Sequence, residues 1–336
     1  MTTTPGTVEV PATETTAHAR NRRPARLARS LLPLAALIAL IIFFGIKADS
    51  FFSMANFTLM TGEAGILLLI ALGATLVVIA GSVDLSVGST VLLTGALLAI
   101  WINNITANLA WAILLTLAIG VGVGLLNGLV FAYGKVPSFI TTLGTLSVLS
   151  GIGLAILDGQ SITFTSDPVS NLAIGQAIPD VQNAALVAVG VFTVVWFLAR
   201  RTSFGLYIYA IGGNEVVVRL AGVKVRRIKL FVMILSAVTA AIGGFLLAGQ
   251  LSSGSPTLGA NSLLNSIAAI VVGGTAISGG VGGIERTALG VLILTVLSDG
   301  LDQMGVNTFV QTSISGTVII IAAVFTMASR RRLVIK

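Results

Sequence analysis

Few side chains in this sequence could do acid–base chemistry within its long apolar segments. Three carboxylates lie in or beside those segments: Glu63 near the start of one, Asp84 in a turn, and Asp299 near the end of another. Ionisable groups at such positions relay protons or bind cations in membrane transporters. No Lys or Arg lies in the middle of an apolar segment, so a proton relay would have very few members. Transport coupled directly to an ion gradient is therefore the alternative and not the first interpretation.

The signatures of common enzyme classes are missing from the sequence. Gly134 and Lys135 are followed by Val136, and no glycine lies five positions before Gly134, so this is not a nucleotide-binding loop. The single His, His18, and the absence of Cys exclude a zinc helix with two His and a thiolate metal site. No Gly-x-Ser-x-Gly turn occurs. We expect no catalytic residue, no metal and no cofactor on this chain.

The composition indicates a membrane protein. Of 336 residues, 55% are hydrophobic and 9% are charged, whereas soluble domains carry about 25% charged residues. The 38 glycines suit helices that pack closely in lipid. The formal charge of +7 comes from bases at the ends of apolar segments, which favours membrane lipid over nucleic acid as a partner.

Apolar runs of about 20 residues predict an all-α polytopic bundle with about ten transmembrane spans. The expected spans are 31–46, 57–80, 86–102, 108–133, 138–157, 183–199, 229–250, 262–281, 285–300 and 309–328. Residues 31–328 would form the transmembrane domain. A disordered, basic cytoplasmic tail is expected at 1–30, and a second basic tail at 329–336.

The basic residues orient the expected spans. If the N-terminus is cytoplasmic, all of the 19 Lys and Arg residues except Lys47 fall on the cytoplasmic side. The longest outer loop, 158–182, contains Asp158, Asp167 and Asp180 and no base. This bias is the positive-inside pattern of multi-pass membrane proteins. It requires an even number of spans, so we expect both termini in the cytoplasm.

The largest cytoplasmic loop, 200–228, contains the pattern of a short surface helix. Asn214 is a good N-cap, Glu215 suits the positive first turn, and Gly222 can end the helix in the left-handed conformation. The residues expected to form this coupling helix are Gly213, Asn214, Glu215, Val218, Arg219, Leu220 and Gly222. A helix of about two turns, capped at both ends, would be a rigid peg for a soluble partner. A plain connection between spans is the alternative.

The turn after the second expected span combines small and polar residues. Its characteristic positions are Gly81, Asp84, Ser86 and Gly88. Asp84 with Ser86 either caps the next span or contacts the coupling helix. The beginning of this turn, residues 79–83, has a weak echo at residues 277–281, although five positions do not establish an internal repeat.

Amides and glycines within the spans have two interpretations each. Asn127, Gln250 and Asn265 either line a translocation path for a polar substrate or make single hydrogen bonds between helices. Gly120, Gly124 and Gly128 recur every four residues on one helix face, which favours tight packing against a neighbouring helix over a pore-lining role.

Four sequence motifs occur in a fixed order along the chain. They are Gly81-Ser-Val-Asp-Leu-Ser-Val-Gly88, Val136-Pro-Ser-Phe-Ile-Thr-Thr-Leu-Gly-Thr145, Tyr209-Ala-Ile-Gly-Gly-Asn-Glu215 with Arg219-Leu-Ala-Gly-Val223, and Ala268-Ala-Ile-Val-Val-Gly-Gly-Thr275 with Ser278-Gly-Gly-Val-Gly282. Together they resemble the permeases of the ribose-type sugar ABC importer family. The resemblance covers about residues 55–328 and leaves out the N-terminal tail and the details of loop 158–182.

The resemblance implies the permease subunit of an ATP-driven importer in the bacterial cytoplasmic membrane. Two copies of the chain, or the chain and a paralogue, would form a dimer. A cytoplasmic ATPase subunit, which would carry ATP and Mg²⁺, would dock on Asn214–Gly222, and an extracytoplasmic sugar-binding protein would deliver the substrate. The expected substrate is a monosaccharide or related polyol. A branched-chain amino acid or a nucleoside is the alternative within the superfamily.

Overall fold

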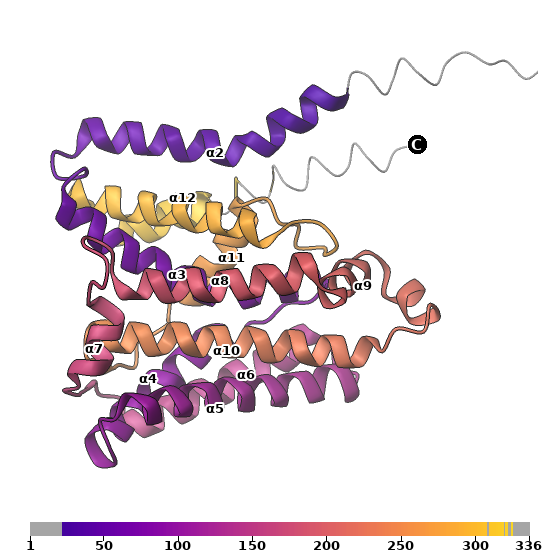
Figure 1. The fold of residues 1–336 in the computed structure, drawn as a ribbon, viewed down its shortest axis with the longest axis horizontal. Coiled ribbons are helices and arrows are strands. Elements are labelled where there is room, and N and C mark those ends of the chain that lie inside the picture. The colour runs from indigo at the N-terminus through magenta and orange to yellow at the C-terminus, as the bar shows by residue number, and fades with distance from the viewer. Residues whose placement is uncertain (1–21, 308, 319, 322–323, 325–336) are drawn as a thin grey trace, which may run out of the picture.

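The chain folds into a bundle of helices (Figure 1). The computed structural model describes the backbone of residues 22–307, 309–318, 320–321 and 324, with side chains from Leu32 onward. Its elements are α2 (Arg22–Lys47), α3 (Met54–Ile79), α4 (Val87–Asn104), α5 (Leu109–Gly128), the π-helical turn η1 (Leu129–Tyr133), α6 (Ser138–Leu157), β1 (Ile162–Thr163), α7 (Asp167–Ile174), α8 (Asn183–Arg201), α9 (Ser203–Leu220), α10 (Val225–Leu251), β2 (Ser253–Gly254), α11 (Ser262–Val272) and α12 (Ile284–Gln303). Residues 309–318 are also helical. The strands β1 and β2 form one short antiparallel pair.

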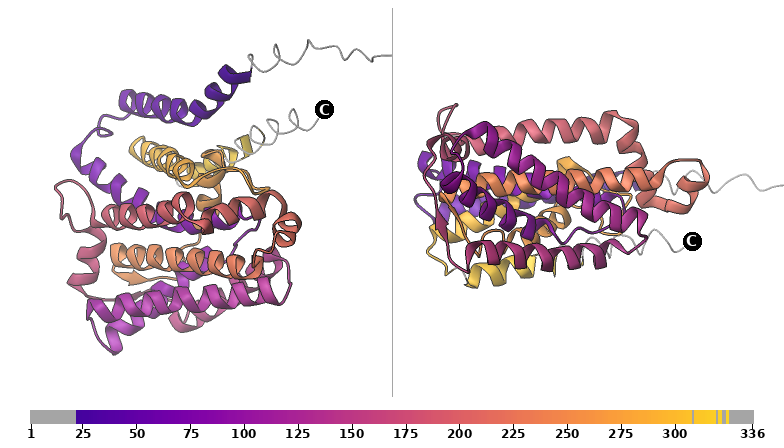
Figure 2. Two further views of the ribbon diagram at one scale, coloured as in Figure 1. Left: turned by 45° about the vertical axis from the view of Figure 1, so that its right-hand side comes forward. Right: turned by 90° about the horizontal axis from the view of Figure 1, so that it is seen from below.

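The long helices lie side by side with their axes roughly aligned, and α9 lies at one end of the bundle and α7 at the other (Figures 1 and 2). Among the described residues, six helices are long and apolar enough to cross a membrane: α3, α4, α5 with η1, α6, α8 and α10. Two shorter apolar helical stretches are Leu32–Lys47 in α2 and Ser262–Val272. The protein is a helical membrane protein.

The centre of the bundle is formed by α3, α4 and α10. In α3, 78% of the most apolar stretch is buried, against 22% in α8, which lies at the periphery. The peripheral helices expose large apolar side chains such as Leu117, Val148 and Phe197. A soluble surface would not carry so many of these, whereas a lipid-facing surface needs them.

Close packing of α5 on α10 depends on three glycines. A Cβ atom added at Gly120, Gly124 or Gly128 would lie closer than 3.0 Å to Val238, Ile234 or Leu230 of α10. Because these glycines lack that atom, the two helix backbones approach closely and gain dispersion contacts along their length. The glycines that recur every four residues in α5 therefore face a neighbouring helix.

The chain between α3 and α4 is not helical, and it lies inside the protein. Residues 80–86 connect Ile79 to Val87, and Ser82, Asp84 and Ser86 are all buried. Further along α4, Val91 packs on Gly244 of α10. Irregular backbone inside a membrane protein is tolerated where protein groups satisfy its hydrogen bonds.

The expected continuous span at 262–281 is wrong. The helix ends at Val272, and residues 273–283 form a loop in which Gly274, Gly279, Gly280 and Gly282 have positive φ. Glycine adopts such backbone angles without the steric cost that a side chain would bring. Hydrophobicity alone did not distinguish this loop from a helix.

The start of the first helix also differs from expectation. We expected residues 1–30 to form a disordered tail, but α2 begins at Arg22. The segment after Arg22 is rich in Arg, Ala and Leu, which are good helix formers, so the helix extends back from the apolar run. The remainder of that tail, the tail at 329–336 and the end of the last expected span lie outside the described residues.

The α5–α10 packing can be tested with two glycines of one helix. In Gly124→Ala the new methyl group meets the α10 backbone, so we expect a lower melting temperature of the purified protein in detergent, corresponding to about 1–3 kcal/mol of overpacking. Gly122→Ala is the matched control, because a Cβ there has nothing within 4 Å. Equal melting temperatures for the two variants would contradict the close packing.

Candidate functional site

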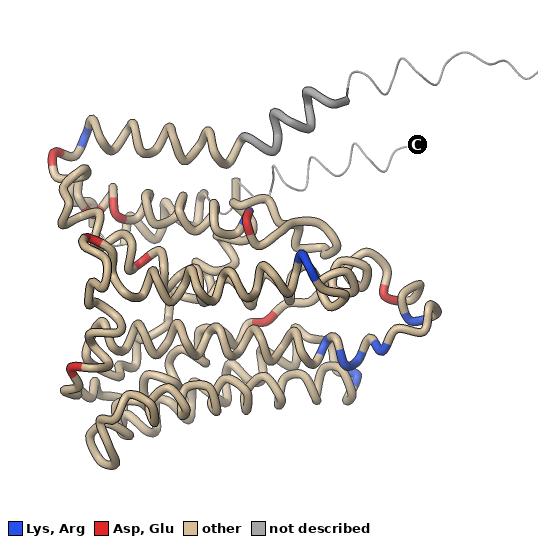
Figure 3. Tube along the Cα trace, in the orientation of Figure 1, with Lys and Arg blue, Asp and Glu red and all other residues tan. Residues whose placement is uncertain are grey.

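The basic residues of the described chain gather at the end of the bundle that carries α9 (Figure 3). This end includes the loop between α8 and α10, and also Lys135 in the connection before α6. The opposite end carries mainly acidic residues, together with Lys47 at the end of α2. Within the described residues, the charges are thus separated along the helix axes, which gives the bundle a distinct cationic end.

A short capped helix projects at this cationic end. Asn214 has extended backbone angles (φ −161°, ψ 99°), which separate residues 215–220 from the preceding part of α9. The Asn214 Oδ1 atom accepts hydrogen bonds from the backbone N–H groups of Val216 at 3.1 Å and Val217 at 3.2 Å. Gly222 follows the helix with φ +83°. This is the N-cap and the left-handed C-terminal glycine expected from the sequence.

An ion pair between Glu215 and Lys229 attaches this helix to the start of α10. Glu215 accepts hydrogen bonds from Arg219 at 2.5 Å and from Lys229 at 2.6 Å. Partial burial acts to raise the pKa of the Glu215 carboxyl, but the hydrogen bonds and charges of Lys229 and Arg219 outweigh it and lower the pKa. Glu215 is therefore ionised at neutral pH and holds the helix against α10.

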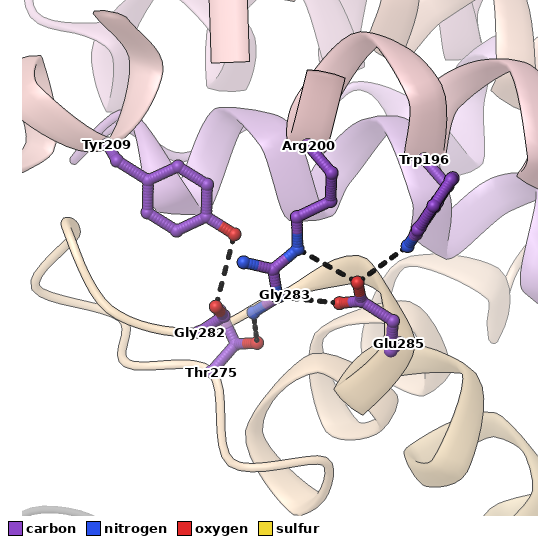
Figure 4. Close-up of polar contacts among 7 residues, drawn as sticks. All are labelled: Trp196, Arg200, Tyr209, Thr275, Gly282, Gly283 and Glu285. Atoms are coloured by element: carbon purple, nitrogen blue, oxygen red, sulfur yellow. Dashed lines mark hydrogen bonds and ion pairs between the residues drawn. The ribbon is translucent and has the colours of Figure 1, made fainter. Parts of the chain in front are cut away.

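A second group of polar contacts joins α8 and α9 to the 273–283 loop (Figure 4). Arg200 donates to both carboxylate oxygens of Glu285, at 2.8 and 2.9 Å, and the indole of Trp196 donates to the same carboxylate at 2.7 Å. The hydroxyl of Tyr209 donates to the carbonyl oxygen of Gly282 at 3.1 Å. A two-pronged Arg–carboxylate pair fixes orientation as well as distance, so the start of α12 follows the position of α8.

Backbone atoms meet closely at what we call the glycine junction: the carbonyl of Ile79 together with Gly81, Gly212, Gly279 and Gly280. The N–H of Gly280 donates to the carbonyl oxygen of Ile79 at 2.8 Å. A Cβ at Gly212 would overlap both of these atoms, and one at Gly279 would lie closer than 3.0 Å to Gly81. Three segments far apart in the sequence therefore meet directly, two residues before Asn214.

The predicted turn residues form a buried network behind this junction. Asp84 accepts hydrogen bonds from the backbone N–H and the hydroxyl of Ser86, at 2.9 and 2.6 Å, and from the hydroxyl of Ser236 at 2.8 Å. The Asn127 amide donates to the Ser86 hydroxyl at 2.8 Å, and Asn127 accepts from Thr145 at 2.6 Å. The network satisfies the polar groups of the irregular segment before α4. Gly88, at its end, packs against the backbone of residue 259.

A polar cavity of about 370 Å³ lies in another part of the bundle. Its lining includes Gln250 and Asn265, two of the amides proposed for the path, with Glu63, Asn261 and Ser298. The third amide, Asn127, is fully buried in the network around Asp84 and lies apart from this cavity. In the part of the chain that the structure describes, no group of acidic or His side chains is arranged to hold a metal ion.

Sequence reasoning missed the contacts of Arg200, Trp196 and Glu285. The sequence did contain a signal for these ion pairs. Glu285 is next to Arg286, and Glu215 lies within the basic loop 200–228, so both carboxylates are close to bases in the sequence. The partner of Glu285 could not be derived, since Arg200 and Glu285 are far apart in the chain. The glycine junction was equally hidden, although its three segments all belong to motifs singled out above.

These features define a multi-pass helical membrane protein in which a capped surface helix is joined to the bundle at its cationic end. Residues 56–323 match the family described as "Branched-chain amino acid transport system / permease component". The chain belongs to this family of transport permeases.

Several relatives are similar over most of the chain. The ribose import permease protein RbsC of Escherichia coli K12 is 35% identical, with 88% of this chain and 91% of the relative covered. RbsC of Bacillus subtilis is 37% identical, over 88% and 91%. The xylose transport system permease protein XylH of E. coli K12 is 32% identical, over 89% and 92%. No solved structure matches the chain significantly.

The glycine junction makes a prediction that does not depend on function. In Gly212→Ala the added methyl group would push the Gly280 amide away from the Ile79 carbonyl. We expect hydrogen exchange at residues 278–282 to become at least about tenfold faster, because this segment opens locally. Gly213→Ala is the neighbouring control, since a Cβ there meets nothing within 4 Å. Unchanged exchange in Gly212→Ala would show that the junction is not tight in solution.

Proposed function

We propose that this chain is the membrane-spanning permease subunit of an ATP-driven importer of a monosaccharide or related polyol. The observation that carries the proposal is the capped helix at residues 214–222, which projects from the cationic end and is joined to the bundle by an ion pair to α10 and, two residues before it, by backbone contacts. The similarity to ribose and xylose permeases supports a sugar as the substrate class. The chain itself would do no catalysis.

The proposed topology has about ten spans, with both termini in the cytoplasm. Two observations support it. Basic residues of the described loops cluster at the end with α9, which would be the cytoplasmic end by the positive-inside pattern. Gly124 of α5 packs on Ile234 and Gly128 on Leu230, so α5 and α10 are antiparallel, as the proposed topology requires of its fourth and seventh spans. The protein would lie in a bacterial cytoplasmic membrane.

The proposed partners follow from what the chain lacks. An ATP-driven permease with no nucleotide-binding loop of its own would work with a cytoplasmic ATPase subunit that carries ATP and Mg²⁺. The helix at 214–222 would dock in a groove of that subunit. A second permease copy or a paralogue would complete a dimer, and an extracytoplasmic sugar-binding protein would supply substrate. Nucleic acid is not among the proposed partners.

The proposed translocation path includes the polar cavity. Gln250 and Asn265 line it and offer both donors and acceptors, which suits the hydroxyl groups of a sugar. Asn127 remains a predicted path residue, although its amide is engaged with Ser86 and Thr145. A path that receives its substrate from a binding protein does not need a tight site.

Two alternatives have an observation in their favour. The family description names branched-chain amino acids, which favours an amino acid as the alternative substrate within the same architecture, with a nucleoside as the other alternative of the superfamily. The presence of Glu63 in the cavity favours an ion-coupled carrier, because a carboxylate there could bind a cation. Such a carrier would transport without any ATPase, which separates it from the proposal.

The role of the capped helix can be tested in the assembled transporter. We expect Glu215→Ala, Arg219→Ala and Gly222→Val each to lower sugar-stimulated ATP hydrolysis by about tenfold, because the helix loses its link to Lys229, its internal ion pair or its terminating glycine. ATPase recovered with the tagged permease should fall in parallel, while insertion in the membrane stays normal. Arg201→Ala is the control, as an exposed base at the same end outside the helix. Normal hydrolysis in all three variants would refute the assignment.

A further inference from the structure

A second cavity opens at the cationic end, beside the capped helix, with a volume of about 660 Å³. It is lined by η1, by the connection before α6, by the end of α9, by the segment that links α9 to α10, and by the start of α10. Its cationic side chains are Lys135, Arg219, Lys224, Arg226, Arg227 and Lys229. The only acidic residue among the lining residues is Glu215, so the cavity is strongly positive.

Most of this charge is not neutralised within the protein. Glu215 pairs with Arg219 and Lys229 and with no other base of the cavity. Lys135, Lys224, Arg226 and Arg227 have no ion pair with any carboxylate of the described residues. Four like charges around one cavity repel one another. An anion in the cavity would relieve that repulsion. Because these four bases lack an ion pair among the described residues, a ligand with several negative charges or a phosphate group fits the cavity best.

The flank of the cavity is apolar. Tyr133 lines the cavity and is 43% exposed, and Leu129, four residues before it, is 50% exposed. On α10, Phe231 follows Arg227 by four residues and is 55% exposed. Residues four apart share a helix face, so a cationic mouth continues directly into exposed apolar side chains. A soluble anion would use the charges and leave this flank bare.

We propose that this cavity binds the headgroup phosphate of an anionic phospholipid, whose acyl chains lie along the apolar flank formed by Leu129, Tyr133 and Phe231. Basic cavities between membrane helices on the cytoplasmic side bind such headgroups, and each nearby Lys or Arg adds to the attraction. The bound lipid neutralises Arg226 and Arg227 and packs beside the helix at 214–222. It therefore supports the base of that helix from the membrane side.

The test uses the purified permease alone, in a neutral detergent, with native mass spectrometry as the readout. Phosphatidylglycerol is the anionic probe, phosphatidylcholine the zwitterionic probe, and inorganic phosphate the soluble one. We expect at least about tenfold tighter binding of phosphatidylglycerol than of phosphatidylcholine, and no retained inorganic phosphate. Neither an ATPase nor a sugar takes part, so failure here is distinct from failure of the proposed transport function.

Variants with matched loss of charge locate the site. We expect Arg226→Gln with Arg227→Gln to abolish the preference for phosphatidylglycerol, and Lys135→Gln alone to weaken it. The control is Arg201→Gln with Arg286→Gln, which removes the same charge at the same end but outside the cavity lining. It should keep the preference.

Three results would overturn the proposal. Equal loss in the cavity variant and the control would reveal a general charge effect. Retention of inorganic phosphate as strong as that of phosphatidylglycerol would make this a soluble anion site. Equal binding of phosphatidylglycerol and phosphatidylcholine by the wild-type chain would show that the cavity does not select an anionic lipid.

Discussion

The hydrogen bond from the Gly280 N–H to the Ile79 carbonyl, closed over by Gly212, is the contact on which the cationic end of this protein depends. It joins the end of α3, the middle of α9 and the loop between α11 and α12 without an intervening side chain. Side chains can change rotamer, but backbone in this close contact can move only with its whole segment. A displacement of the capped helix would therefore reach α3 and α12 together, aided by the Arg200–Glu285 pair.

The same constraint explains the irregular backbone inside the bundle. For residues 80–86 to leave α3 and return into the protein, their polar groups must find partners away from water. Asp84 provides these by accepting three hydrogen bonds, and Asn127 ties the segment to α5 and α6. A buried polar network is stable when its members are hydrogen-bonded to one another, as Asp84, Ser86 and Asn127 are here. The motif around Asp84 is thus part of the framework that supports the junction.

Sequence reasoning obtained the class of protein, most of the helices and the capped helix, because each depends on local patterns. Long apolar runs, the N-cap Asn214 and the left-handed Gly222 are readable without knowing what lies nearby. The end of α11 at Val272 was missed, since an apolar, glycine-rich loop has the hydropathy of a span. Residues 79–83 and 277–281 were noted only as an echo. Their direct contact through Ile79 and Gly280 is a long-range property that no local pattern encodes.

The central claim is that the capped helix and the 273–283 loop move as one body, and the distance between them tests it most directly. The chain contains no Cys, so spin labels can be attached at Val217→Cys and Ile277→Cys alone, both at exposed positions. Pulsed electron paramagnetic resonance would measure the distance between the two spin labels in the resting transporter and in its ATP-bound state. The measurement would use a doubly labelled protein that still transports. The account predicts the same label-to-label distance in both states. A separate distance population that appears on ATP binding would contradict it.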